Sequence, residues 1–290
     1  MHYKGLFFGL TTIDIQYFVD RFPEINRKLK TDAPDILVGG PATNAAVAFS
    51  YLNNGAHLVS AVGESAFSAF IRDDLANNKL QFTDIGNTDT KPVIASVVTS
   101  SNGDRNIFTH HPEIQTGSFE PLEIIDQIQP EIILMDGFYP ELAIPLAQHA
   151  LQQKIPVVLD CGSWKPQYNE LLKYTDTAIC SADFQPPACK SSGEVFRFLH
   201  KAGVKNRVIT RGGEPILFEH ENGKGEFAVE KTKVIDTLGA GDFFHGAYCY
   251  YRLKMKDFER ALNAASQVAT FSCKYKGTRE WLNHDIVVNV

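Results

Sequence analysis

The sequence predicts a three-layer α/β/α domain of the Rossmann-like class, with a mostly parallel central sheet and a small lid of β-strands. Two observations lead to this prediction. From about residue 120 onward, short apolar runs alternate with amphipathic stretches, which is typical of parallel strands joined by crossover helices. In the first third, hydroxyl and amide side chains interrupt the apolar runs, as expected of a sheet covered on one face or of a lid over a site.

The length and charge of the chain limit its organisation and its partners. It has 290 residues and a formal net charge of -6. No repeat, low-complexity tract or linker rich in Pro, Gly or Ser divides it, so we predict one domain over residues 1–290, with a lid formed by roughly residues 12–38 and 90–112. An acidic chain without a dense basic run lacks the positive charge that binds nucleic acid or an anionic membrane, so we expect a small molecule as its partner.

The cysteines and the first residues indicate a cytoplasmic protein. Five scattered cysteines form no C-x-x-C pair, so neither zinc nor a dithiol centre is expected, and the thiols are predicted to be reduced. The opening MHYKGLFFGLTTID has too short an apolar run for a signal peptide. No later run approaches the roughly 20 residues of a membrane-spanning helix.

The lid is predicted from four strand-like segments in the first third, which we expect to form a small antiparallel group. Asn102 and Gly103 give the short hairpin turn between the last two segments. The four segments are 13–22, 35–39, 92–100 and 105–110.

The body is predicted from apolar strands that lack polar alternation, as expected where both faces of a sheet are covered. These strands are 131–137, 155–160, 177–181 and 207–213, followed by a hairpin of 214–220 and 225–231. The predicted helices are 140–153, 192–203, 240–254 and 257–274.

The most informative segment for function is VIDTLGAGDFFHGAYCYY (234–251). Gly239, Ala240 and Gly241 stand at the mouth of the predicted helix, where small residues let a ligand approach the backbone and unpaired N–H groups make a phosphate site. Asp242 then lies in the first helical turn, where it can accept a proton from a hydroxyl that attacks a phosphoryl group. The alternative is that the glycines only make a tight turn and that Asp242 caps the helix.

A second segment, VGGPATNAAVAFSYLNNG (38–55), also joins a strand to a helix. Gly39 and Gly40 end the strand, and Pro41 opens the helix. Asn44 thus lies about one turn into the helix, where its amide offers a donor and an acceptor to a sugar hydroxyl. The alternative is a local bond to the backbone near the helix start.

Both segments resemble signatures of one family. The heptad D-T-L-G-A-G-D at 236–242, continued by F-F-H-G-A, resembles the C-terminal signature of the ribokinase-like (PfkB) carbohydrate kinases. The pattern G-G-x-x-x-N-x-A, followed by a strand and V-G, resembles their N-terminal signature, and the two occur in the family's order. The resemblance implies a ribokinase-like fold and an ATP-dependent kinase, with Asp242 as the base beside an anion hole.

The same resemblance assigns substrate-binding residues. It implies that Asp14, near the end of the first strand candidate, binds sugar hydroxyls together with Gly39, Gly40 and Asn44. Without the resemblance, Asp14 is a loop or edge-strand charge.

The resemblance also assigns residues on the nucleotide side. Thr210 and Gly212 match the family's T-x-G stretch, and Asn263 matches a position that contacts adenine, with a solvated helix face as its alternative. Asp236 matches a position associated with a monovalent-cation loop, for a cation such as K⁺. Alternatively, Asp236 only holds the turn through backbone N–H bonds.

The sequence departs from the family pattern at the metal. The N-x-x-E motif that helps to place Mg²⁺ through water is absent, and C-S-A-D-F (180–184) stands in its place. Asp160 and Asp183 remain the candidates for placing Mg²⁺ through water.

The substrate class rests on shorter patterns. The C-S-A-D-F stretch, the K-P after LDCGSW and the SNGDRNIF hairpin look more like ketohexokinase and related bacterial fructose-type kinases than like ribokinase, although Pro41 stands where ketohexokinases usually have a sugar-binding Asn. Arg105 could bind an anionic group of the substrate through its guanidinium fork, or pair with Asp104 at the surface. His110 and His111 could face the sugar.

We therefore predict ATP-dependent phosphorylation of a primary hydroxyl of a small sugar of the ketohexose or fructose type. The alternatives are a kinase for a sugar phosphate or another anionic sugar, a nucleoside kinase, and a catalytically silent sugar-binding regulator. The intact Asp242 and its G-A-G segment disfavour the silent regulator. Family analogy and the exposed lid strands favour a homodimer through the lids.

Overall fold

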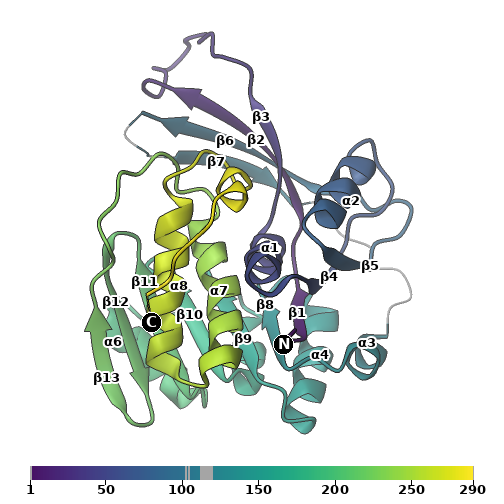
Figure 1. Cartoon of the computed structure of the whole chain (residues 1–290), viewed down its shortest axis with the longest axis vertical. Coiled ribbons are helices and arrows are strands. Elements are labelled where there is room, and N and C mark those ends of the chain that lie inside the picture. The colour runs from purple at the N-terminus through teal and green to yellow at the C-terminus, as the bar shows by residue number, and fades with distance from the viewer. Residues whose placement is uncertain (1, 102, 104, 112–119, 290) are drawn as a thin grey trace.

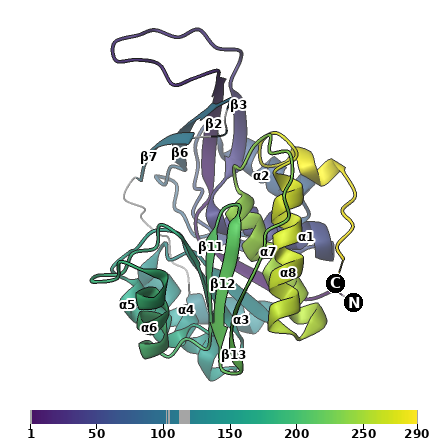
Figure 2. The same ribbon diagram turned by 90° about the vertical axis from the view of Figure 1, so that its left-hand side faces the viewer.

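In the computed structural model, which describes residues 2–101, 103, 105–111 and 120–289, a large sheet lies between two layers of helices (Figure 1). A second, smaller sheet stands at one end of this body. Figure 2 shows the layers from the side, with α7 and α8 on one side of the large sheet and α4 and α6 on the other. The predicted three-layer α/β/α arrangement is confirmed.

The large sheet has nine strands and is mostly parallel, as predicted. All neighbours from β11 to β5 run parallel, and the β12–β13 hairpin extends the sheet with antiparallel pairs. In spatial order its strands are β13 (Gly223–Phe227), β12 (Glu214–His220), β11 (Asn206–Arg211), β10 (Thr177–Ser181), β9 (Val157–Cys161), β8 (Ile132–Met135), β1 (Gly5–Phe8), β4 (Ala56–Ser60) and β5 (Leu80–Asp84).

Each face of the large sheet has its own hydrophobic core. In β1, Phe7 packs into one core, whereas Leu6 and Phe8 pack into the other. Because both faces are covered, such a strand needs apolar residues at every position, which is why these strands show no polar alternation. The helices of the first core are α1 (Pro41–Asn53), α2 (Ser68–Asn77), α7 (Ala240–Met255) and α8 (Phe258–Ser272). Those of the second are α3 (Pro121–Ile128), α4 (Pro140–Gln152), α5 (Tyr168–Leu171) and α6 (Ser192–Lys201), and two short 3-10 helices cover Leu172–Tyr174 and Glu280–Asn283.

The smaller sheet is built from the segments predicted for the lid. Its spatial order is β3 (Asp35–Gly39), β2 (Thr12–Val19), β6 (Val93–Ser100) and β7 (Arg105–His110). The expectation of an antiparallel group is wrong for one pair, because β2 and β6 run parallel over their whole length. The reason is that β1 and β5 are parallel strands of the body, and the chain leaves each at the same edge to enter the smaller sheet.

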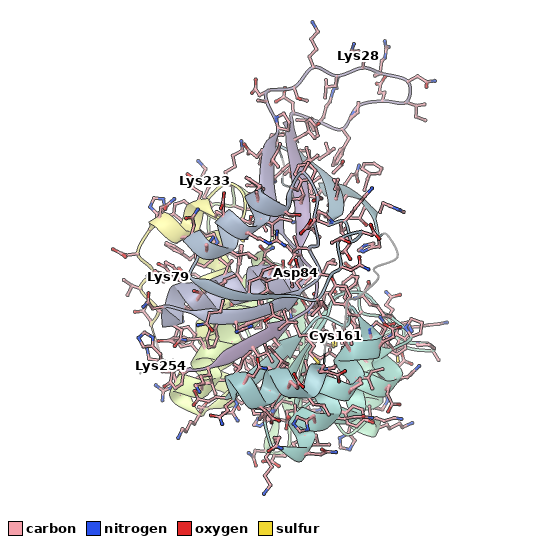
Figure 3. The ribbon with its side chains drawn as sticks, turned by 90° about the vertical axis from the view of Figure 1, so that its right-hand side faces the viewer. Lys28, Lys79, Asp84, Cys161, Lys233 and Lys254 are labelled. Carbon is pink, nitrogen blue, oxygen red and sulfur yellow. The ribbon has the colours of Figure 1, made fainter. Side chains whose placement is uncertain are left out.

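The connections of the smaller sheet differ in length. Residues 20–34, between β2 and β3, extend well beyond the sheet, and Figure 3 labels Lys28 at the outer end of this loop. In the predicted turn between β6 and β7, Gly103 has a left-handed φ of 87°, while Asn102 lies outside the described residues, as do Asp104 and residue 112.

Most predicted boundaries agree with the structure, and one hairpin is shifted. Helices α7 and α8 begin and end within two residues of the predicted 240–254 and 257–274. The second strand of the 214–231 hairpin, by contrast, covers Gly223–Phe227 instead of 225–231. All five cysteines are free. Within the described residues, none of the helices is long and apolar enough to cross a membrane.

Candidate active site

Acidic side chains gather where the parallel strands of the body end. Asp136 directly follows β8, Asp160 lies near the end of β9, and Asp183 follows β10. Asp242 lies in the first turn of α7. Because the carboxyl ends of parallel strands meet at one edge of a sheet, this edge is where an α/β sheet binds its ligands.

Asp242 is the central side chain of this edge. It is half-buried, and its Oδ2 accepts a hydrogen bond of 2.9 Å from Nδ2 of Asn44. Burial, followed by the negative charge of Asp160, raises the pKa of Asp242 to about 7, against the lowering effects of the Asn44 hydrogen bond and of His245. A carboxylate with a pKa near neutrality is poised to take up a proton at physiological pH.

The turn before Asp242 leaves room for an anion. Gly239 has a φ of 76°, and a Cβ there would lie 2.9 Å from Cζ of Phe243, so this position requires glycine. A Cβ at Gly241 would meet nothing within 4 Å, so the space beside it is open. The N–H of Ala240 donates to Thr237, whereas the N–H groups of Gly241 and Asp242 have no acceptor among the described residues.

Of the three residues predicted for the anion hole, Ala240 is the one whose amide has an acceptor among the described residues. The amide of Ala240 closes the turn. The amides of Gly239, Gly241 and Asp242 have no acceptor among the described residues, and the dipole of a 16-residue helix adds to their attraction for an anion.

Asn44 lies in the first helical stretch after β3, as expected, and it is almost fully buried. Its side chain makes no local backbone bond. Instead, Nδ2 donates to Asp242, and Oδ1 accepts a bond of 2.9 Å from Nη1 of Arg279. The structure therefore brings two predicted residues together and adds a third, Arg279, that the sequence did not indicate.

Asp14 lies at the start of β2 and not at the end of the first strand, which stops at Phe8. Its side chain is buried and faces the body, and its Oδ1 accepts a bond of 2.7 Å from Oγ1 of Thr12. Burial raises the pKa of Asp14 above its ordinary value. The hydrogen bond from Thr12 and the charge of Arg279 act in the opposite direction, but their effects are smaller.

Gly39 and Gly40 are explained by close packing at this place. A Cβ on Gly39 would lie 2.1 Å from Oδ2 of Asp14, and a Cβ on Gly40 would lie 2.2 Å from the carbonyl oxygen of Leu10. Gly40 also has a φ of 103°. Only glycine lets β3 and the start of α1 approach the β1–β2 connection so closely.

The candidates for Mg²⁺ placement differ in their surroundings. Asp160 is buried, and its Oδ1 lies 3.6 Å from Nε2 of His245. Asp183 is exposed in the turn after β10. Among the described residues, no group of three His, Cys, Asp or Glu side chains could hold a metal by itself.

Asp236 is fully engaged by donors from three parts of the chain. Its Oδ2 accepts bonds of 2.9 Å from Nε2 of Gln16 and from the N–H of Gly277, and its Oδ1 accepts a bond of 3.0 Å from the N–H of Leu238. These contacts agree with the interpretation that Asp236 holds the turn before α7. They also tie the smaller sheet, through Gln16, to the loop that carries the anion site.

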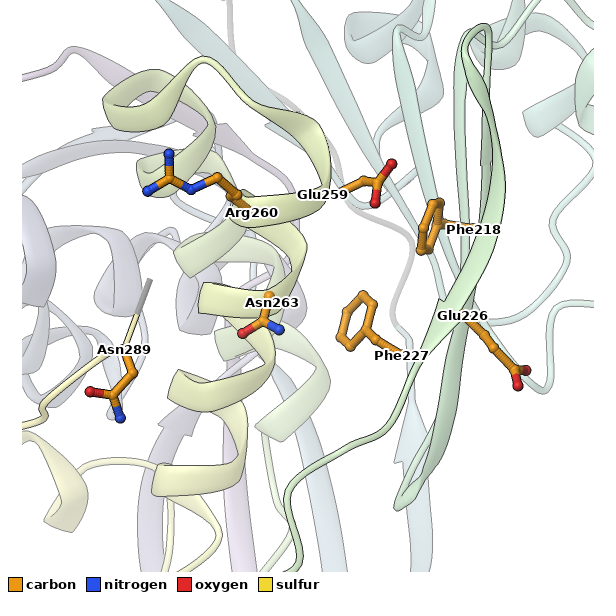
Figure 4. Close-up of a pocket in the computed structure, with 7 residues that line it drawn as sticks. All are labelled: Phe218, Glu226, Phe227, Glu259, Arg260, Asn263 and Asn289. Atoms are coloured by element: carbon orange, nitrogen blue, oxygen red, sulfur yellow. The ribbon is translucent and has the colours of Figure 1, made fainter.

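The three predicted nucleotide-side residues have different surroundings, and Asn263 is the one that lines an open cavity. Gly212 has a φ of 60° with free space around it, and the hydroxyl of Thr210 donates to the Cys180 carbonyl. The exposed side chain of Asn263 lines a cavity of about 350 Å³ between α8 and the β12–β13 hairpin (Figure 4). The other lining residues are Phe218, Glu226, Phe227, Glu259, Arg260 and Asn289.

Arg105 opens β7, as predicted, but it is distant from Asp14. Arg105 is opposite Thr99, whereas Asp14 is opposite Ala95, so the two are about 13 Å apart along the strands. At the other end of β7, His111 stacks on Phe138 at a centroid distance of 5.3 Å.

Sequence reasoning missed three residues of this edge. Asp136 accepts backbone bonds from Leu10, Ala42 and Phe138, and burial raises its pKa to about 6. Its place directly after an apolar strand was a usable signal. Arg279 carried none, because its partners Asp74 and Asn44 lie far away in the sequence. His245 stands in the F-F-H-G-A stretch, but its neighbour Asp160 comes from a distant strand.

A larger cavity lies away from Asp242. It has a volume of about 580 Å³ and lies at the amino ends of β10 and β11, beside Thr177 and Asn206. It therefore does not belong to the carboxyl edge described above.

Comparisons with known proteins give similar sequences over nearly the whole chain. Residues 4–285 match the pattern described as pfkB family carbohydrate kinase. The chain is 25% identical to the ribokinase of Arabidopsis thaliana (93% of this chain, 76% of the relative) and 23% identical to the ketohexokinase of Mus musculus (93% and 95%) and to the nucleoside kinase of Methanocaldococcus jannaschii (93% and 90%).

Solved structures show the same fold. The Arabidopsis thaliana ribokinase complexed with ribose and ATP superposes with a TM-score of 0.77 at 21% identity, covering 98% of this chain and 100% of that one. An E. coli chain described as a ribokinase II, in complex with ATP and Mg²⁺, superposes with a TM-score of 0.77 at 16% identity, covering 97% and 96%.

Proposed function

Because this chain belongs to the pfkB family of carbohydrate kinases, we propose that it transfers the γ-phosphoryl group of ATP to a primary hydroxyl of a small sugar of the ketohexose type. One observation carries the proposal. The carboxylate of Asp242, with a pKa of about 7, lies in the first turn of α7, where the described residues leave two backbone N–H groups free for an anion.

Asp242 and the start of α7 have different roles in the proposed reaction. Asp14 and Asn44 bind the sugar, whose hydroxyl then donates its hydrogen to ionised Asp242. Asp242 takes this proton as the hydroxyl oxygen bonds to the γ-phosphorus and the bond to the bridging oxygen of ADP breaks. The N–H groups of Gly241 and Asp242 stabilise the charge on the transferring group.

The carboxyl edge fits a Mg²⁺ ion held through water and substrate phosphates. Asp160 is buried near Asp242, and their mutual repulsion raises the pKa of Asp242, which a cation between them would relieve. Mg²⁺, which accompanies ATP in the E. coli structure, neutralises charge on the phosphates. Asp160 would hold it through water, and the exposed Asp183 would complete the outer contacts.

The nucleotide would extend from the helix start toward α8. Gly212 offers free space beside its backbone, and the cavity at Asn263 has aromatic walls in Phe218 and Phe227. A volume of about 350 Å³ lies at the lower end of the range for ligand pockets. Thr210 would contact the nucleotide with its backbone, because its hydroxyl already bonds to Cys180.

The smaller sheet would act as a lid that excludes water from the phosphoryl transfer. Asp14 projects from it toward the body, and the bond between Gln16 and Asp236 couples it to the turn before α7. A monovalent cation such as K⁺ at the 236–238 turn would have to bind backbone carbonyl oxygens, since the Asp236 carboxylate has its own donors.

The lids would also join two copies of the chain. On the outer face of the smaller sheet, Ile15 pairs with Ile36, and Phe108 lies two strands away in the same row. Ile36, Ile94 and Phe108 are 48%, 40% and 67% exposed. Such an apolar row on exposed strands suits a homodimer. A cytoplasmic location stays a prediction, which fractionation of the native cells would check.

Some relatives support other phosphoryl acceptors for this chain. The nucleoside kinase of Methanocaldococcus jannaschii supports a nucleoside, and the several ribokinases support ribose. Arg105 supports an anionic sugar, although its distance from Asp14 places it beyond a small substrate.

The proposal is tested by ADP release with Mg²⁺-ATP and a panel of acceptors: D-fructose, D-ribose, fructose 6-phosphate and adenosine. We expect the highest kcat/KM with D-fructose. Preference for fructose 6-phosphate or adenosine would replace the ketohexose with that class. ATP binding without turnover of any acceptor would instead favour a silent sugar-binding regulator.

A further inference from the structure

Four side chains form one continuous chain of hydrogen bonds that ends at Asp242. Nε and Nη2 of Arg279 donate to the two carboxylate oxygens of Asp74 at 3.1 Å and 3.0 Å. Nη1 of Arg279 donates to Oδ1 of Asn44 at 2.9 Å, and Nδ2 of Asn44 donates to Asp242 at 2.9 Å. The four residues come from α2, the C-terminal segment, α1 and α7.

The direction of these bonds is fixed by chemistry. An Asn side chain can turn by 180° and exchange its acceptor for its donor, whereas a guanidinium only donates. With Arg279 on one side, Asn44 must present its oxygen there and its NH₂ group to Asp242. Arg279 itself cannot turn away, because Asp74 holds it at two points and both side chains are largely buried.

We propose that Arg279, locked by Asp74, is a positioning residue that sets the Asn44 amide so that it donates to Asp242. This inference rests on the proposed role of Asp242 as the base. The bond from Asn44 holds Oδ2 of Asp242 in place and leaves Oδ1 for the sugar hydroxyl.

The arrangement also limits how Asn44 meets a sugar. Arg279 holds the Asn44 oxygen on the side away from Asp242, so the NH₂ group faces Asp242 and keeps one N–H after its bond to that residue. Asn44 therefore acts toward the sugar as a donor, and it recognises a hydroxyl oxygen. The acceptor for the sugar hydrogens is then left to the carboxylates of Asp14 and Asp242.

The first test reads the amide directly in the ligand-free protein and needs no substrate. The charged groups that face Asp242 are Asp160, Asp14 and His245, and none of them is substituted. Because the charge of Arg279 also lowers the pKa of Asp14, the titration of Asp14 is followed in the same spectra. Side-chain ¹⁵N spectra would follow Asn44, and ¹³C carboxyl titration would follow Asp242. In Arg279→Met, we expect the Asn44 signals to shift and the pKa of Asp242 to rise by about one unit, the scale of one charge-assisted hydrogen bond.

The control is Arg72→Met, which removes an ion pair between α2 and Asp84 without touching Asn44. It should leave both signals unchanged. Should Arg279→Met fail to fold, Asp74→Asn loosens the same guanidinium with an isosteric side chain. An Asn44 signal and an Asp242 titration that are the same in wild type and in these variants would overturn the inference.

The second test is a double-mutant cycle on kcat, with the best acceptor of the panel. Arg279→Met should lower kcat about 10-fold with an unchanged KM for ATP, and adding it to Asn44→Ala should cost nothing further. Effects that multiply would show that Arg279 does not act through Asn44. A wild type that phosphorylates no acceptor would remove the proposed function, while the spectra would still decide the role of Arg279.

Discussion

Asp242 shares a crowded edge with other acids. Burial and the Asp160 charge raise its pKa to about 7, while burial raises those of Asp14 and Asp136 as well. These shifts mean that the fold holds carboxyl groups where their ionised forms are costly. A kinase active site gains from this arrangement, because a base with a pKa near 7 is both ionised and basic enough to take a proton.

Replacing Asp242 should separate catalysis from binding. In Asp242→Asn, the amide keeps an acceptor for Asn44 but cannot take the hydroxyl proton. We expect kcat to fall by at least ~10²-fold, the usual scale for loss of a general base, with nearly unchanged ATP affinity. Steady-state kinetics and calorimetric ATP titration would measure the two quantities. A variant that retains most of its turnover would exclude Asp242 as the base.

The same substitution should change how stability depends on pH. The unfolded carboxyl has a pKa near 3.8 and the folded one about 7, so the folded state binds the extra proton between these values. The contribution of this carboxyl group to the free energy of unfolding is therefore complete below a pH of about 3.8, and it is lost as the pH rises through about 7. We expect Asp242→Asn to raise Tm more at pH 8 than at pH 5.

Differential scanning calorimetry at the two pH values would measure this difference. The exposed Asp73 offers a surface control, and Asp73→Asn should change Tm little at either pH. A Tm gain that is larger at pH 5 would contradict the assigned direction.

The residues of the candidate site could be predicted from the sequence where they lie within a local sequence motif. Asp242 and Asn44 each stand at a strand-to-helix junction with small residues before it, and the structure joins them by one hydrogen bond. Arg279 was not predictable, because its two partners lie 205 and 235 residues away. From the sequence alone, a single arginine after a loop could pair with any of many surface acids. Only the tertiary fold determines which partners it contacts.

At the scale of elements, helices α1 and α7 determine the distance between Asn44 and Asp242. They cross where Gly246 faces the backbone of Ala45, and a Cβ on Gly246 would lie 2.0 Å from the Ala45 carbonyl oxygen. Ala45 is the neighbour of Asn44, and Gly246 is one turn after Asp242. The close crossing therefore holds the side chains of Asn44 and Asp242 within hydrogen-bond distance.

Widening this crossing should weaken both the fold and the reaction. In Gly246→Ala, the clash with backbone forces the helices apart, so we expect a loss of about 1–3 kcal/mol in the free energy of unfolding. We also expect a lower kcat, because the bond between Asn44 and Asp242 is stretched. Urea unfolding and kinetics would measure the two effects.

Gly193→Ala in α6 is the matched control, since a Cβ there meets only the end of Arg197 at 3.8 Å. This helical substitution should be neutral or stabilising by up to about 1 kcal/mol. Equal effects of the two substitutions would contradict the role given to the α1–α7 crossing.

The elements themselves were largely predictable, and their pairing was less so. The apolar runs and helix starts fixed α7 and α8 to within two residues. The relative direction of β2 and β6 depends instead on the edge of the large sheet at which the preceding strands, β1 and β5, end. The amino-acid sequences of β2 and β6 do not contain this information. The β12–β13 hairpin shifted for a similar reason, because several polar residues could form its turn.

At the scale of the whole molecule, the C-terminal segment connects the body to the smaller sheet. Gly277 donates its N–H to Asp236, and the hydroxyl of Thr278 donates to the Val38 carbonyl of β3. Lys276 pairs with Asp35 of the same strand at 2.8 Å. One short segment thus contacts the smaller sheet, the turn before α7 and, through Arg279, the Asn44 side chain that bonds to Asp242.

The proposed lid-to-lid homodimer belongs to this scale. Replacing the exposed Phe108 and Ile36 by serine removes apolar area from the outer lid face, so we expect the double variant to be monomeric where the wild type is dimeric. Light scattering coupled to size exclusion would measure the mass. Val287→Ser, at another exposed apolar position, should leave the mass unchanged. A monomeric wild type at tens of micromolar would rule out the dimer.

The bond from Arg279 to Asn44 joins residues that the ribosome makes far apart in time. A ribosome makes Asn44 and Asp74 early, Asp242 late and Arg279 last of these four. Domains form from the N-terminal side as the chain emerges, so the first helices have time to fold before their last partner exists. The growing chain therefore holds Asn44 and Asp242 before Arg279, which we propose orients the Asn44 amide, has been made.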